Sequence, residues 1–132
     1  MRAARLITCV LCVNLLAGCV TTNGDRASVS YAVPSNYRQL VARRVIEGTA
    51  HIGPIRSATI SQPADKFAGI VNGGTRPVVC ATTINEGRVI SQSTTFLFLF
   101  ENGQIAQATI NPGAIWCLGL QDGPFPEVVK AK

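Results

Sequence analysis

The sequence predicts a small α+β domain in which one N-terminal helix packs on an antiparallel meander of about four strands. Three patterns support this prediction. Apolar residues recur at helical spacing over residues 36–47, a run of β-forming residues occupies 94–100, and Asn102-Gly103 joins that run to a second one. The domain is expected at residues 34–132, which is long enough for a single modest core.

The helix is expected to start after Pro34, where Ser35 or Asn36 can serve as its N-cap. One face of this helix carries the side chains that recur at three- and four-residue spacing: Tyr37, Leu40, Val41, Arg44 and Val45. Gly48 is expected to end the helix as the residue after its C-cap. The predicted helix is therefore a single amphipathic element that needs a sheet to pack on.

Alternating apolar and β-branched residues predict strands along the rest of the chain, separated by turns that contain glycine, proline or asparagine. The expected strands are residues 52–61, 77–84, 88–100 and 104–110, with a short last strand at 114–120. Residues 122–132 contain two prolines and a glycine, and they are expected to form a mobile, loop-like tail.

The turn at Asn102-Gly103 sets the expected register of its hairpin and places three phenylalanines on one face. The expected pairs are Phe100–Ile105, Phe98–Gln107 and Phe96–Thr109, with Leu99–Ala106 and Leu97–Ala108 on the other face. Neither face is polar, so both need cover. The helix can cover one face. We expect the ends of the chain to cover the other, with a second copy or a partner protein as alternatives.

The N-terminus has the organisation of a signal peptide. Arg2 and Arg5 precede an apolar run of eleven residues, Leu6–Leu16, which the small residues Ala17-Gly18 follow. Such a run fits the roughly 7–15 residues of a signal-peptide core and is shorter than the about 20 residues of a membrane span. Residues 1–18 are therefore expected to be removed from the mature protein.

The residues Leu16-Ala17-Gly18-Cys19 resemble the lipobox of bacterial lipoproteins at every position. This resemblance implies that Cys19 is lipidated, becomes the first mature residue and anchors the protein in a membrane. Stable attachment takes more than one acyl chain, which acylation of both thiol and amine would supply. Val20 stands where an aspartate would resemble an inner-membrane retention signal, which favours the outer membrane in a Gram-negative cell. Residues 19–33 are then expected to be a flexible tether; a plain secreted protein is the alternative.

The five cysteines divide by position. Cys9 and Cys12 belong to the leader and Cys19 to the lipobox, which leaves Cys80 and Cys117 as an even pair in an oxidising compartment. A disulfide between these two is expected, and it would hold the last strand near residues 77–84. The alternatives are two buried free thiols and, with no activating partner visible, a catalytic cysteine.

No motif points to catalysis, a metal or a cofactor. His51 is the only histidine, and no His, Cys or acidic residue accompanies it at a metal-ligand spacing. The seven acidic residues are scattered, and no two of them suit general acid–base chemistry. The formal net charge of +5 falls to +3 without Arg2 and Arg5, which gives no reason to expect nucleic acid as a partner. The protein is therefore not expected to be an enzyme.

Residues 37–110 also resemble small Gram-negative lipoproteins of no known activity. The similarity rests on Tyr37-Arg38 in the helix, on Val79-Cys80 in a strand that leads to Asn85, and on Asn102-Gly103 after an aromatic strand. Together with the lipobox, it implies a protein on the periplasmic face of the outer membrane, held to the membrane by its N-terminal lipid.

Two functions fit this location. The first is a non-enzymatic accessory or adaptor that binds another envelope protein in an outer-membrane assembly, an analogy of size and location. The alternative is a module that binds a small envelope glycan or lipid. In either case, the expected contact face is that of Phe96, Phe98 and Phe100.

Overall fold

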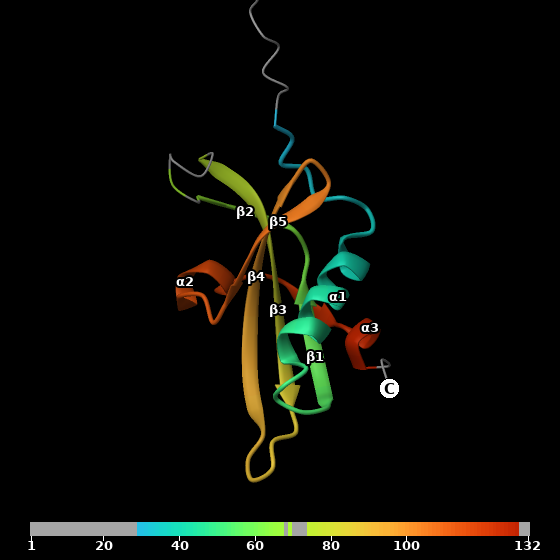
Figure 1. The fold of residues 1–132 in the computed structure, drawn as a ribbon. Helices are drawn as coiled ribbons and strands as arrows, with labels where there is room; N and C mark the ends of the chain where they lie inside the picture. The colour runs from blue at the N-terminus through green and yellow to red at the C-terminus, as the bar shows by residue number, and fades with distance from the viewer. Residues whose placement is uncertain (1–28, 68, 70–73, 130–132) are drawn as a thin grey trace, which may run out of the picture.

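The computed structural model describes residues 29–67, 69 and 74–129, which form a helix packed on a six-stranded antiparallel sheet (Figure 1). The elements in chain order are α1 (Tyr37–Thr49), β1 (Ile55–Ser61), β2 (Ala64–Phe67), β3 (Thr75–Asn85), β4 (Gln92–Glu101), β5 (Gln104–Ile110), α2 (Ala114–Cys117), β6 (Asp122–Pro124) and α3 (Pro126–Val129). The strand order is β5-β4-β3-β1-β6, and β2 pairs with β3. The predicted α+β class is confirmed, but the sheet has six strands rather than about four.

Helix α1 starts one residue and ends two residues later than predicted. Gly48 lies inside the helix and does not end it. An added Cβ at Gly48 would lie 3.0 Å from the ring of Phe96, so the glycine allows the helix to approach the sheet closely. The hydroxyl of Thr49 donates to the Val45 carbonyl at 2.8 Å in the last turn.

Strands β1 and β2 run along the same side of β3 and are separated by a bulge. The pairs that flank the bulge are Ile60–Ala81 and Ala64–Val78, so this side carries one residue more than β3. The amide of Cys80 donates to the Ser61 hydroxyl there at 2.9 Å. The predicted strand 52–61 stops before Pro63, and β2 was not predicted because a proline commonly ends a strand. At a bulge, however, the pairing can resume after a proline.

Strands β4 and β5 form the predicted hairpin. Both turn residues of Asn102-Gly103 have positive φ, 51° and 75°, as a type I′ turn requires. The pairing of Phe100 with Ile105 is confirmed, but a bulge between Leu99 and Phe100 shifts the register beyond it. The other pairs are Leu99–Gln107, Phe98–Ala108, Leu97–Thr109 and Phe96–Ile110. The predicted register was wrong there because turn length sets only the pairs before a bulge.

Each face of the sheet has its own apolar cluster. The larger cluster joins α1 to the phenylalanine face and the C-terminal segment; its bulkiest members are Phe96, Phe98, Phe100 and Phe125. The smaller cluster, on the opposite face, is formed by Val78, Cys80, Leu97 and Leu99, with Trp116, Cys117 and Leu120 packed against it. The domain's own segments therefore cover both faces of β4, as we expected, whereas most side chains of β5 are exposed.

The C-terminal segment differs from the prediction. Residues 114–117 form helix α2 instead of a strand, and α2 lies on the opposite side of the sheet from α1 and α3 (Figure 1). Residues 122–124 form β6, an added strand beside β1, rather than part of a loop. Phe125 and Val128 are 1% and 2% exposed. These elements are too short for local periodicity to reveal, and burial against the sheet decides their structure.

Candidate functional site

The predicted contact face is buried. Phe96, Phe98 and Phe100 are 2%, 0% and 0% exposed beneath α1. The rings of Phe96 and Phe98 stack with their centroids 6.1 Å apart. These residues form the core of the domain, so the prediction that they offer a partner or ligand face was wrong.

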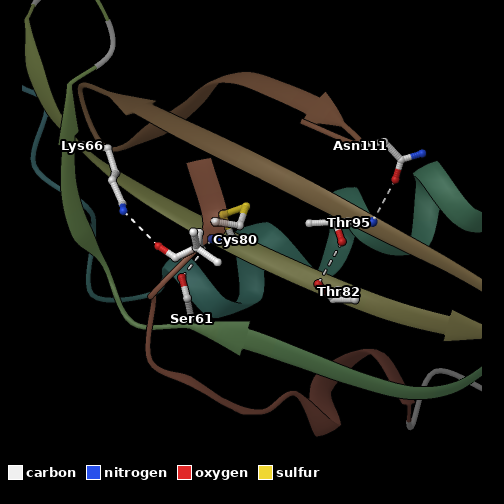
Figure 2. Close-up of a disulfide and its surroundings, with 8 residues drawn as sticks. Ser61, Lys66, Cys80, Thr82, Thr95 and Asn111 are labelled. Carbon is white, nitrogen blue, oxygen red and sulfur yellow. Dashed lines mark hydrogen bonds between the residues drawn. A yellow bond between two sulfur atoms is a disulfide. The ribbon is translucent and has the colours of Figure 1, made fainter. Parts of the chain in front are cut away.

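Cys80 and Cys117 are joined in a disulfide, as expected, and are not two buried free thiols (Figure 2). The bond links β3 to the end of α2. Lys66 Nζ supports the same segment by donating to the Leu118 carbonyl at 3.1 Å. Both contacts hold α2 over the smaller apolar cluster, so the disulfide has a structural role here.

The N-terminal end of the described chain is attached to the β4–β5 turn. The amide of Ser30 donates to Asn102 Oδ1 at 3.0 Å, and the amide of Asn102 donates to the Ser30 carbonyl at 2.6 Å. The Tyr31 ring lies 4.2 Å from the guanidinium carbon of Arg76. The end of the predicted tether is therefore docked on the domain. The leader and Cys19 lie outside the described residues, and lipidation stays a prediction.

Arg76 is a buried cation that the sequence analysis missed. Its side chain is 5% exposed, donates from Nη2 to the Phe100 carbonyl at 2.9 Å and lies 3.1 Å from Glu101 Oε1. Because side chains alternate along a strand, Arg76 shares the covered face of Val78 and Cys80. That alternation was the signal that could have found it. Arg76 positions the docked N-terminal segment.

Arg38 holds the C-terminal segment against α1. Its guanidinium donates to both carboxylate oxygens of Glu127, at 2.6 and 3.0 Å, and to the Pro124 carbonyl at 2.8 Å. It also lies 5.5 Å from the centre of the Phe125 ring. The contact with Glu127 raises the pKa of Arg38 further above the neutral range. These contacts fasten β6 and α3, and they explain Arg38 without a ligand.

Strand β5 is an exposed edge of the sheet. Among the described residues it pairs with β4 alone, and most of its side chains are exposed: Gln104, Ala106, Gln107, Ala108 and Ile110. An edge strand presents backbone N–H and C=O groups that can bind a further strand. Charged residues and prolines commonly block such edges, and β5 contains neither. Sequence reasoning did not find this edge because strand order is a tertiary property.

Two grooves adjoin β5, one on each face of the sheet. The groove beside α1 has a volume of about 280 Å³ and is lined by Leu40, Arg43, Arg44, Glu47, Gln104 and Ile105. The groove beside α2 has a volume of about 210 Å³; its lining includes Leu97, Leu99, Gln107, Thr109, Pro112 and Trp116. One groove is therefore basic and the other mainly apolar, with the edge strand between them.

A larger recess, about 460 Å³, lies between the start of α1 and the β1–β6 pair. Tyr37 and Arg38 line it from the helix, and Gln62, Gln121 and Asp122 line it from the strands. An aromatic ring beside amide and carboxylate groups suits a polar ligand such as a sugar. Arg38 is already engaged with Glu127, so the remaining polar groups would carry any such contact.

Among the described residues, no three His, Cys, Asp or Glu side chains lie together as a metal site would require. His51 lies exposed in the turn after α1. None of the helices in the described part of the chain is long and apolar enough to span a membrane. Comparisons with protein-family models, with curated proteins and with solved structures find no match to this chain.

Proposed function

We propose that this protein is a lipid-anchored adaptor on the periplasmic face of the outer membrane, which binds another envelope protein through the edge of β5. The observation that carries the adaptor role is the open, uncharged edge formed by β5 in a sheet whose central strands are covered on both faces. A covered sheet leaves its edge as the place where a protein segment can bind through main-chain hydrogen bonds.

Three features support the proposed location. The lipobox ends at Cys19, and disulfides such as Cys80–Cys117 persist in oxidising compartments such as the periplasm. The chain from Cys19 joins the domain at Ser30 and Tyr31, beside the β4–β5 turn. Ser30 contacts the turn and Tyr31 contacts Arg76, so neither of these docked residues pairs with the backbone of β5.

Fractionation of a Cys19→Ser variant tests the anchor. We expect the unmodified protein in the outer-membrane fraction with an acylated Cys19, and the variant in the soluble periplasm with its domain folded. Mass spectrometry of both proteins identifies the acyl groups. A variant that stays in the membrane fraction would contradict lipid anchoring through this thiol.

A photo-crosslinking amino acid at position 108 tests the adaptor role in intact cells. Ala108 lies exposed in the middle of β5, and the same amino acid at Ser57, exposed in β1, is the matched control. We expect one defined protein adduct from position 108 and none from position 57. Absence of any protein adduct at position 108 would contradict the adaptor function.

The recess beside Tyr37 favours a second candidate function, a module that binds a small envelope glycan. The observation that supports it is the polar lining of this recess. The recess replaces the phenylalanine face as the proposed ligand site, because that face is buried. Isothermal titration with soluble peptidoglycan fragments distinguishes the two. Binding that is abolished by Tyr37→Ala and by Asp122→Asn would favour the glycan-binding module. A titration without binding heat would favour the adaptor function.

A further inference from the structure

We infer that β5 accepts an added strand from a partner whose residues alternate between acidic and apolar side chains. This inference rests on the proposed adaptor function and specifies the chemistry of the partner. It combines three observations: the direction of the backbone groups of β5, the basic groove on the α1 face and the apolar groove on the α2 face.

Within the part of the chain that the structure describes, the backbone of β5 offers unpaired groups at defined positions. The amide of Asn111, just after the strand, donates to the Thr95 carbonyl of β4 at 2.7 Å. Backbone groups alternate in direction along an antiparallel pair, so those of Thr109 and Gln107 also face β4. The N–H and C=O groups of Ala108 and Ile110 then face away from the sheet. These two residues can bind an incoming strand without loss of the β4–β5 hydrogen bonds.

The groove on the α1 face favours an acidic side chain. Arg43 and Arg44 line it together with one carboxylate, that of Glu47, which lies 3.4 Å from Arg44. Within the described residues, no ion pair joins Arg43 to a carboxylate. A strand added beside Gln104 and Ile105 would bring its α1-face side chains within reach of Arg43, where an acidic group gains a charge-assisted contact.

The groove on the α2 face favours an apolar side chain. It lies between β5 and Trp116, over Leu97 and Leu99. Trp116 and Pro112 are only partly buried, so an apolar group placed here removes further apolar surface from water. Successive side chains of a strand point to opposite faces. A single segment with alternating acidic and apolar residues would therefore satisfy both grooves.

A second copy of this chain is the less suitable occupant. In an antiparallel pair of β5 strands, the added strand would carry the residues Gln-Ile-Ala-Gln-Ala-Thr-Ile of residues 104–110. That strand contains no carboxylate for Arg43. The charge of the α1 groove thus points to a partner protein with acidic residues rather than to self-association.

The test uses the purified full-length protein in mild detergent and a nine-residue peptide of alternating glutamate and valine with blocked ends. Trp116 is the only tryptophan, so its fluorescence reports occupation of the α2 groove directly. We expect saturable binding that weakens with added salt, and slower hydrogen exchange at the amides of Ala108 and Ile110. A peptide with lysine in place of glutamate should bind at least ten-fold more weakly.

Two blocked forms test strand addition. A glutamate–valine peptide that is N-methylated at every residue has no backbone N–H on either edge, so it cannot form the ladder and should lose binding, whatever the folding of any protein variant. Ala108→Pro removes an outward N–H from β5 and should also abolish binding. Arg43→Gln should weaken binding several-fold, whereas Arg56→Gln, at an exposed arginine of β1, should not change it.

The inference is overturned if the lysine peptide or the N-methylated peptide binds as well as the original. It is also overturned if β5 binds a second copy, which crosslinking through position 108 would reveal as a dimer. If no peptide binds but position 108 still captures a different protein, the adaptor function stands and only the chemistry inferred for its partner fails. Loss of both results would contradict the two proposals together.

Discussion

Replacement of Cys80 and Cys117 by serine is expected to destabilise the domain strongly. The disulfide closes a loop with a sequence separation of 37. In the chain-entropy model, a crosslink that closes a loop of this size lowers the entropy of the unfolded state. Its removal therefore lowers the free energy of unfolding by about 4 kcal/mol at 25 °C. For a domain of this size, each kcal/mol corresponds to roughly 4–8 °C in melting temperature, so a fall of about 15–30 °C is expected.

The structure also predicts the order in which parts of the disulfide-free variant lose their structure. Helix α2 has four residues and no buried side chain of its own. Without the disulfide, the packing of Trp116 and Leu120 and the Lys66–Leu118 contact hold this segment on the sheet. Because a single short helical turn is not stable alone, the segment should detach before the rest of the domain unfolds.

Urea unfolding followed by two signals tests this reasoning. Trp116 fluorescence reports the detachment of α2, and far-ultraviolet circular dichroism reports the sheet and α1. In the double variant, the fluorescence transition should occur at a lower urea concentration than the circular dichroism transition, while both coincide in the unmodified protein. A loss of stability below about 1 kcal/mol, or coincident transitions in the variant, would refute the assigned role of the crosslink.

Three further predictions concern the core, the turn and the C-terminal attachment. Phe98→Ala should cost about 3–5 kcal/mol of unfolding free energy because the ring is fully buried, whereas Val89→Ala, at a residue 92% exposed, should change it by less than about 0.5 kcal/mol; urea titration measures both. Gly103→Ala should cost roughly 1–2 kcal/mol because φ is 75° there, and calorimetry should show a lower melting temperature with an unchanged fold. Glu127→Gln should cost at most about 1 kcal/mol, since both partners of the Arg38–Glu127 pair are about one-third exposed. Because the contact with Glu127 raises the pKa of Arg38, the guanidinium stays charged and its stabilisation is complete at every pH below the ordinary pKa of arginine. The cost of Glu127→Gln should therefore be equal at pH 7 and pH 9. A cost that disappears by pH 9 would contradict this assignment.

The elements that the sequence predicted well are those with strong local signals. Helix α1 follows from its three- and four-residue spacing, and the β4–β5 turn follows from Asn102-Gly103. The pairing of Cys80 with Cys117 could be predicted by elimination, because they are the only cysteines left after the leader and lipobox. Each of these inferences needs only near neighbours in the chain or the identity of a residue.

The elements that were missed depend on distant parts of the chain. The bulge near Leu99 shifts the register of β5, and no property of the hairpin sequence reveals it. Strand β6 has three residues and forms because β1 offers an edge beside Thr59. Arg38 contacts the last residue of β6, Pro124, and also Glu127 in the segment that follows. The exposed β5 edge and its grooves arise from strand order and from the position of α2, which are likewise set by tertiary packing.

The sequence by itself determined the α+β class, the order of the main elements and the chemical character of the strands, because hydrophobic periodicity and turn chemistry act over a few residues. The tertiary structure decided which surface stays open. It buried the phenylalanine face that the sequence had suggested for binding, since α1 and the C-terminal segment remove that large apolar area from water. It left β5 as an edge because none of the described strands lies beyond it to continue the backbone pairing.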